Sequence, residues 1–406
     1  MFFFGAVLLT CCVPFAGLFA GIVIKKAPSQ FGRWLWVYIM FIAIVAYSYT
    51  PTYTNDLIRY FNMIEACKSL PFSQSFSWGD DGLIVKNFWF WCVGQINEPH
   101  LIQAITIGGL YGVTAFITWD SFSENRCSMW IVILVQILLL PLHLANNNIR
   151  NMFTFSFMFF AVYRDLVKKK RNVLTAILYI GPIFVHMAGL AVIMARIGML
   201  LFRKHYKLGL TLTFSIPFVI LSAYPVLSNV TIPGNIGKII KRAIWKSYTS
   251  VLSNSAYALS MQESGYINAC RVVMFIACVS IIILTLRYLY KTEEKTSGQN
   301  EYMIFNMIFC SITCMWILLG AVKFWVFAVG SIIGSGPVLS RYYEEKKPGQ
   351  FEKILILVLE IMGICRAALE LYYINQRIVW VEYFTTLFST NIWTILIHII
   401  RELMRI

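Results

Sequence analysis

Long apolar runs recur from one end of the chain to the other, and they restrict its possible folds more than any other feature. Of the 406 residues, 59% are hydrophobic and only 13% are charged. A helix needs about 20 apolar residues to cross the ~30 Å hydrocarbon core of a membrane, and many of the runs approach or reach that length. Backbone groups in lipid must bond within the protein, and the runs lack β alternation. The sequence therefore predicts an all-α polytopic integral membrane protein, with a single transmembrane domain over residues 1–406.

The runs predict about 11–14 transmembrane helices, some of them accompanied by short re-entrant helices. The first run has no basic segment before it and is too long for the core of a cleaved signal peptide, so we expect an uncleaved span. The apolar stretch 171–203 is broken at Gly181-Pro182 and should form two short helices, because proline removes a helical hydrogen bond. Besides this stretch, the predicted spans cover about residues 3–24, 34–50, 100–119, 129–145, 152–167, 208–228, 267–290, 304–321, 324–340, 353–374 and 380–400.

Basic clusters give the orientation, because membrane proteins concentrate Lys and Arg in cytoplasmic loops. They assign the N-terminus to the outside and the C-terminus to the inside, and two long loops, about 51–99 and 229–266, then lie on the outer face. The short apolar segment 83–97 contains Lys86. If it crossed the membrane, the cluster 168–171 would face outward, so we expect a re-entrant or interfacial helix. The net charge of +15 has the same cytoplasmic-loop origin, and we expect no nucleic acid as a partner.

Arg150 is the most informative single residue. It lies in the polar run Asn146-Asn147-Asn148-Ile149-Arg150-Asn151, between two apolar spans, where a charge is expensive and usually has a function. A guanidinium fork binds two phosphate oxygens at once and stays charged at any membrane depth. The asparagine amides are suited to bind sugar hydroxyls, or to cap the helix expected to start near Met152. The alternative is an arginine that only reaches the interface beside a capping asparagine.

Further polar residues are expected near the same outer face. His186 is a candidate base or phosphate donor, and a bond to a neighbouring helix carbonyl is its structural alternative. Asp56 and Arg59 are three residues apart and would share a helix face, and Tyr60 follows them. They either bind substrate, with Asp56 as a base and Arg59 on a pyrophosphate, or simply pair with each other.

The second outer loop is basic and aromatic. Its cations and rings suit a sugar chain that ends in pyrophosphate, because rings stack on pyranose faces; a helix lying on anionic headgroups is the alternative. Lys323, between two apolar runs, is either a second anion contact or a solvated hairpin residue. No metal-binding or nucleotide-binding motif is present, so we expect no metal and no cofactor. The candidate binding residues of the loop are Lys241, Arg242, Trp245 and Tyr248.

These elements resemble the short motifs of bacterial repeat-unit polysaccharide polymerases of the Wzy class, in particular the EpsG-like branch. That family has an Asp-x-x-x-Tyr element after its second span, an Asn-x-Arg element before a middle span, and a Phe-His or Val-His pair after it. The family also has a later arginine before an aromatic-rich span, and this chain has Lys323 in its place. Arg341 is a second candidate for that arginine, but the predicted topology places it on the cytoplasmic side. The matching residues are Asp56 and Tyr60, Asn148 and Arg150, and Val185 and His186.

The resemblance implies a membrane glycosyltransferase that polymerises undecaprenyl-pyrophosphate-linked oligosaccharide repeat units at the outer face of the bacterial inner membrane. The growing glycan of an O-antigen, capsule or exopolysaccharide would pass as a block to the incoming repeat unit. Arg150 and Lys323 would hold the pyrophosphate, Arg59 would assist, and His186 or Asp56 would be the base or position the acceptor. A chain-length regulator and a flippase of the same pathway are the expected partners.

Two other functions remain open from the sequence. A flippase or transporter of lipid-linked oligosaccharide would need a central cavity with charges from both leaflets, whereas the predicted charges gather on one face. A membrane-bound acyltransferase would need a site facing a cytoplasmic acyl donor. The candidate residue on the cytoplasmic side is His205, but it lies in a solvated basic run, which is poor support for such a site.

Overall fold

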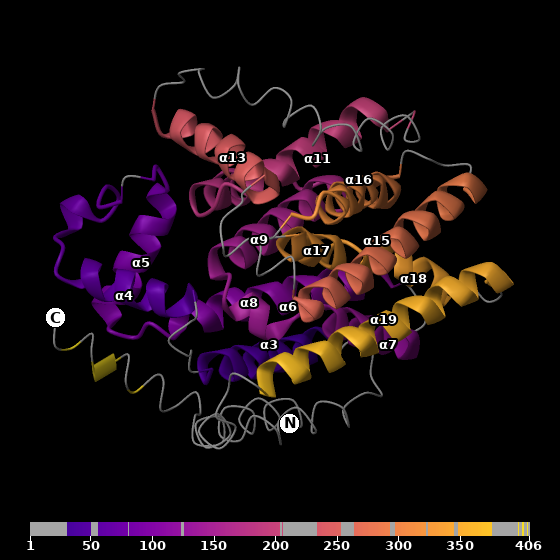
Figure 1. Ribbon diagram of the computed structural model, residues 1–406, viewed down its shortest axis with the longest axis horizontal. Helices are drawn as coiled ribbons and strands as arrows, with labels where there is room; N and C mark the ends of the chain where they lie inside the picture. The colour runs from indigo at the N-terminus through magenta and orange to yellow at the C-terminus, as the bar shows by residue number, and fades with distance from the viewer. Residues whose placement is uncertain are drawn as a thin grey trace.

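A bundle of helices forms the protein, as the ribbon diagram of the computed structural model shows (Figure 1). Over the described residues the chain is helical and has no strand, which confirms the predicted all-α class. The predicted spans at 3–24 and 208–228, and nearly all of 380–400, lie outside these residues. The structure describes residues 31–49, 56–79, 81–122, 126–203, 205, 234–252, 264–292, 297–321, 324–344 and 348–375, with positions 397, 400, 401 and 404.

Three of the described helices are long and apolar enough to cross a membrane: α6 (Leu101–Ser121), α15 (Gly265–Lys291) and α16 (Gly298–Leu318). Helices α17 (Phe324–Ile333) and α18 (Gly336–Glu344) meet at a bend of 45° and together have the composition of a fourth span. The protein is therefore an all-helical chain with three or four candidate membrane spans among its described residues.

The other helices pack around or between these spans. The break predicted at Gly181-Pro182 is confirmed, because a regular helix ends at Ile180 and a new one begins only at Gly189. The longer elements of this group are α3 (Phe31–Tyr47), α7 (Arg126–Leu139), α9 (Ile149–Leu166), α11 (Gly189–Phe202), α13 (Gly234–Leu252) and α19 (Gln350–Asn375). The short ones are α4 (Asp56–Lys68), η3 (Phe72–Gln74), α5 (Ile84–Ile96), α8 (Leu142–Asn146), α10 (Val173–Ile180) and η4 (Gly181–Phe184).

Aromatic rings form the centre of the bundle, where α9 packs against α16. Phe159 meets Phe305 and Phe309 with ring centroids 5.1 Å and 5.0 Å apart, and Phe155 lies 5.6 Å from Phe309. Edge-on ring pairs of this kind fill a core densely and add to the area that they bury. This packing holds α9, which carries Arg150 in its first turn, at a constant position in the bundle.

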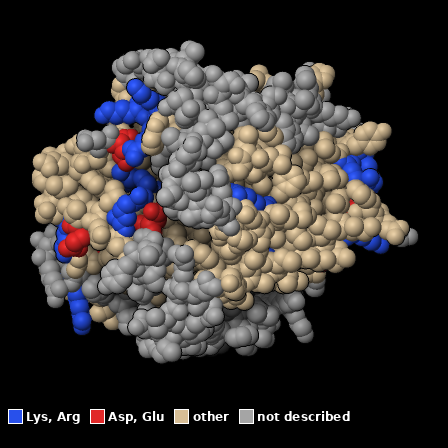
Figure 2. Space-filling model, in the orientation of Figure 1, with Lys and Arg blue, Asp and Glu red and all other residues tan. Residues whose placement is uncertain are grey.

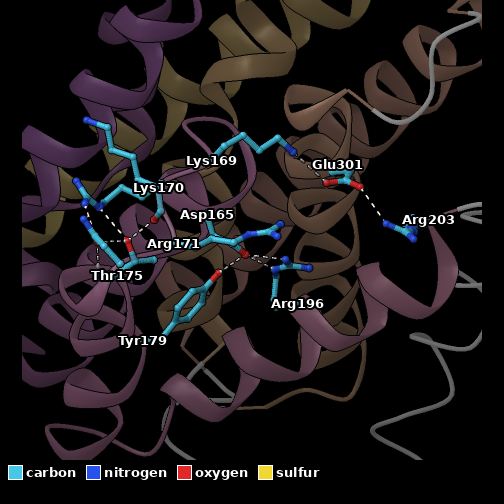
Figure 3. Close-up of polar contacts among 11 residues, drawn as sticks. Asp165, Lys169, Lys170, Arg171, Thr175, Tyr179, Arg196, Arg203 and Glu301 are labelled. Carbon is cyan, nitrogen blue, oxygen red and sulfur yellow. Dashed lines mark hydrogen bonds and ion pairs between the residues drawn. The ribbon is translucent and has the colours of Figure 1, made fainter.

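One end of the bundle is built from ion pairs, and we call it the Asp165 end (Figure 3). Asp165 on α9 accepts hydrogen bonds from Arg196 of α11 at 2.6 Å and from Arg171 at 2.7 Å. Glu301 on α16 lies 3.9 Å from Lys169 and 3.5 Å from Arg203. These contacts tie together the end of α9, the end of α11 and the start of α16.

The opposite end carries α4, α5 and α13, and we call it the α5 end (Figure 1). Leu83, Met187 and Ile239 pack there as a small apolar cluster, which joins the start of α5 to the turn before α11 and to α13. Gly82 has φ +73°, and a Cβ atom at this position would lie 3.2 Å from the backbone oxygen of Asn235. The loop before α5 therefore approaches α13 closely.

Most of the charged side chains seen in Figure 2 lie toward the two ends of this face, and few interrupt the tan surface drawn between them. Large apolar side chains are exposed along α19, on α15 and at the last residue of α16, as expected where helices face lipid rather than water. Among them are Val272, Leu318, Ile354, Leu357, Ile361 and Ile364.

Candidate functional site

Two cations pair with one carboxylate at the α5 end, and the charge of a third acts on it. We call the four residues, Asp81, Lys86, Arg150 and Arg242, the Asp81 cluster. Lys86 Nζ lies 2.6 Å from Asp81 Oδ2, and Arg242 Nη1 lies 3.9 Å from the same oxygen. The charge of Arg150 acts on both Asp81 and Lys86. Since α5, α9 and α13 each supply one cation, the cluster exists only in the folded protein.

The Lys86–Asp81 pair is buried, with side chains 1% and 13% exposed. Burial acts to raise the pKa of Asp81, but the hydrogen bond and charge of Lys86 outweigh it, so this pKa is lower than usual. The pKa of Lys86 is also below its ordinary value, because burial disfavours the ammonium and the Asp81 contact only partly opposes it. Trp78 lies 5.2 Å from the ammonium and adds a ring face to it.

Arg150 lies in the first turn of α9, half-buried, with its guanidinium 5.0 Å from the centroid of the Tyr60 ring. Arg59 stands over the same ring at 5.4 Å. The Tyr60 ring is itself fixed edge-on against Phe90 of α5, with centroids 5.9 Å apart. Arg150 Nε is buried and has no hydrogen-bond partner among the described residues. An unpartnered buried donor on a charged group is costly, so this nitrogen suits an anionic ligand.

The asparagines beside Arg150 also carry unpartnered atoms. Both amide atoms of Asn146 and the amide oxygens of Asn147 and Asn151 are buried without a hydrogen bond to any described residue. Asn148 occupies the N-cap position of α9, but its side chain does not cap the helix; its Nδ2 donates to the Leu144 carbonyl at 3.2 Å. The capping role considered for the asparagines is therefore wrong for Asn148, because this bond points back to α8.

His186 lies at the same end as Arg150, in the turn between η4 and α11. Its Nδ1 accepts a hydrogen bond from the backbone N–H of Ala188 at 3.1 Å, which orients the ring. The next residue, Met187, packs against Leu83 just before α5. His186 therefore lies at the α5 end of the bundle, through the packing of its neighbour Met187 beside the start of α5.

Asp56 and Arg59 form the ion pair that was the structural alternative for them. Asp56 Oδ1 lies 3.6 Å from Arg59 Nη2, and the side chains are 40% and 58% exposed. An exposed pair at this spacing contributes little to stability, so both groups are available to a ligand.

The second outer loop is only partly described. Lys241, Arg242 and Trp245 are exposed on α13, and of these Arg242 reaches the Asp81 cluster. Lys323 and the side chain of Tyr248 lie outside the described residues. Arg341, the rival to Lys323, bonds to Gln299 near the start of α16, at the Asp165 end, so it is not near Arg150.

Asp81 and Lys86 were not predicted as site residues. Lys86 was noticed only as a reason against a crossing helix, although a lysine within a short apolar segment is a functional signal in itself. Nothing in the sequence near Asp81 points to Arg150, because the two are brought together by the packing of α5 against α4 and η4. The resulting concentration of positive charge can bind and neutralise a phosphate-type anion.

Comparison of the chain with protein-family models, with curated proteins and with solved structures finds no match.

Proposed function

We propose that the protein is a membrane glycosyltransferase that polymerises undecaprenyl-pyrophosphate-linked oligosaccharide repeat units at the outer face of the bacterial inner membrane. One observation carries the proposal: Lys86 of α5 and Arg242 of α13 pair with Asp81, the charge of Arg150 on α9 acts on the same carboxylate, and Arg150 Nε has no partner among the described residues. The site has excess positive charge, carboxamides and aromatic rings. These are the groups that a sugar with a pyrophosphate leaving group requires.

In the reaction, an acceptor hydroxyl attacks the anomeric carbon of the growing glycan while the bond to the pyrophosphate oxygen breaks. Arg150, Lys86 and Arg242 stabilise the charge that develops on the leaving group, and their fixed positions make this stabilisation effective. His186 or Asp56 takes the acceptor proton. The Lys86–Asp81 bond keeps Lys86 in place when the substrate is absent.

The topology belongs to the same proposal. We infer about 11–14 membrane-embedded helices, with the N-terminus outside, the C-terminus inside and the α5 end on the outer face. The segment 84–96 is a 13-residue helix, which is about 20 Å long and too short to cross a ~30 Å core. This short length supports a re-entrant or interfacial α5, and therefore an orientation with the N-terminus outside and the C-terminus inside.

A glycan ladder gel tests the function. A bacterial strain with the chromosomal gene deleted is complemented with wild type, Arg150→Ala, Arg150→Lys or Arg171→Ala at matched membrane levels. We expect deletion to leave a single repeat unit and wild type to restore the ladder. Both Arg150 variants should fail, because a lysine cannot replace a bidentate guanidinium. Arg171→Ala, at the Asp165 end, should restore polymer and thus controls for a general loss of basic charge.

Two results would overturn the proposal. A normal ladder from Arg150→Lys contradicts the role given to the guanidinium fork. Loss of even the single repeat unit from the cell surface on deletion places the block before polymerisation, and the flippase function then takes the place of the enzyme.

A further inference from the structure

A buried polar network lies directly behind the turn that presents Arg150. Its centre is His143 on α8, which is 2% exposed. The Tyr49 hydroxyl lies 2.6 Å from His143 Nδ1, and the amide nitrogen of Asn147 lies 3.1 Å from Nε2. Contacts at both ring nitrogens hold the imidazole in one orientation, between the segment after α3 and the end of α8.

The backbone of His143 is anchored as well. Its N–H donates to Glu370 Oε1 at 2.6 Å, and Arg366 Nη2 donates to the other oxygen of that carboxylate at 2.9 Å. The ring of Tyr373, also on α19, meets the His143 ring edge-on with centroids 5.2 Å apart. A buried charge pair resists separation, because either charge alone is costly in the interior. Helix α8 is therefore tied to α19 through His143.

Asn147 connects this network to the site. It stands directly before Asn148, the N-cap of α9, and Arg150 follows in the first turn of that helix. The backbone N–H of Asn147 donates to the His143 carbonyl at 3.1 Å, and that of Asn151 donates to the Asn148 carbonyl at 2.9 Å. Helix α8 has only five residues, and so short a helix has little stability of its own. The contacts of His143 therefore hold the turn that carries Arg150.

We propose that His143 is a positioning residue for the Arg150 site and acts through its Nε2 contact with Asn147. The identity of the substrate at this site rests on the proposed function, whereas the contacts of His143 do not. When the Asn147 amide nitrogen donates to Nε2, the ring proton lies on Nδ1 and is donated to the Tyr49 oxygen. The amide oxygen of Asn147, buried and unpartnered within the described part of the chain, is then left for a ligand hydroxyl.

Two substitutions separate the two ring contacts. The side-chain amide of His143→Gln extends to the position of Nε2 and can accept from Asn147, whereas that of His143→Asn extends only to the position of Nδ1. Purified protein in detergent is treated with phenylglyoxal, which modifies accessible guanidinium groups. Peptide mass spectrometry then gives the modification rates of Arg150 and of Arg203 at the Asp165 end, which serves as the internal reference.

We expect the rate at Arg150 to rise roughly fivefold to tenfold in His143→Asn and to stay near the wild-type rate in His143→Gln. A lost hydrogen bond raises the population of the open turn by about that factor. The rate at Arg203 should not change in either variant. Polymer synthesis should fall about tenfold to a hundredfold in His143→Asn, since a small misplacement of a binding group costs that much, and should be retained in His143→Gln.

Equal Arg150 rates in the two variants, whether raised or not, would show that the Nε2 contact makes no difference and that the proposal is wrong. A rise at Arg203 together with Arg150 reports general unfolding and contradicts it as well. If the reactivity pattern holds but wild type makes no polymer, His143 is a positioning residue and the proposed polymerisation is wrong. The two proposals therefore fail separately.

Discussion

Lys86 is the one charged residue of α5; its side chain is 1% exposed, and its charge is balanced by Asp81 just before that helix. Arg150 and Arg242 add two more positive charges near the pair. Such a concentration of like charge is unfavourable in an empty site, and proteins retain it where an anion binds. At the scale of single residues, the Lys86–Asp81 pair is therefore expected to affect both the stability of the fold and the binding of an anion.

Breaking this pair should destabilise the protein. We expect Asp81→Asn to lower the free energy of unfolding by about 3 kcal/mol or more, because it leaves the Lys86 ammonium buried beside two further cations. The matched control is Glu65→Gln, which removes an exposed carboxylate 4.0 Å from Lys68 and should cost less than about 0.5 kcal/mol. Denaturant unfolding in detergent measures the free energy of unfolding of both variants. Equal losses in the two would show that burial does not make the Lys86–Asp81 pair more important than an exposed pair.

The pH dependence of stability should report Asp81 itself. Its pKa is lower in the folded state than in the unfolded chain, where it is about 3.9. The contribution of the ionised group is therefore fully present above about pH 4 and is lost as the pH falls through the lower folded pKa. The difference in unfolding midpoint between wild type and Asp81→Asn should shrink as the pH falls from about 4 toward the acid limit of folding. If the difference in midpoint does not change with pH, ionised Asp81 does not make this contribution to stability.

Helix α5 is the element on which the orientation depends. It has 13 residues, it packs against α4, and its N-terminal loop approaches α13. A crossing helix would place its two ends on opposite sides of the membrane, whereas a re-entrant or interfacial helix places both ends on one side. The apolar composition of the segment cannot separate these two arrangements, but its length and its neighbours favour the second.

Cysteine labelling tests this arrangement. We expect Ser77→Cys and Pro99→Cys, which flank α5, both to react with a membrane-impermeant maleimide added to intact cells. Lys170→Cys, exposed at the Asp165 end, should react only in inverted vesicles. The unsubstituted chain gives the background from its native cysteines. Labelling of the Ser77 and Pro99 variants from opposite sides would show that α5 crosses the membrane.

At the scale of the whole molecule, the two charged ends act differently. At the α5 end cations are in excess and several polar atoms lack partners in the described chain, which suits a binding site. At the Asp165 end the carboxylates of Asp165 and Glu301 each bridge two cations from different segments (Figure 3). This second end therefore serves to fasten helices that are distant in sequence.

Asp165→Asn tests the fastening role. Two arginines lose the charge of their shared carboxylate, and Arg196 is only 13% exposed, so we expect a loss of about 1–3 kcal/mol in the free energy of unfolding. Hydrogen exchange should rise in α11, which is bound to α9 through this contact, and should be unchanged in α5. Faster exchange spread evenly over both helices would contradict a local fastening role.

The sequence alone determined the helical class, the positions of most described helices and the break at Gly181-Pro182. These follow from local causes: the length of an apolar run, the need of backbone groups for partners in lipid, and the missing N–H of proline. Arg150 was also singled out from the sequence, because a charge between two apolar spans is unusual in any fold. Tyr60 was named through the family resemblance, and the role of both residues stays a prediction.

Only the tertiary structure decided which groups stand beside Arg150. Lys86 is 64 residues before it in the chain and Arg242 is 92 residues after it, and no pattern within one segment encodes their meeting. The same holds for His143, whose partners Tyr49 and Glu370 come from the segment after α3 and from α19. Contacts of this kind depend on how helices pack, and packing is a property of the whole set of side chains rather than of any one run.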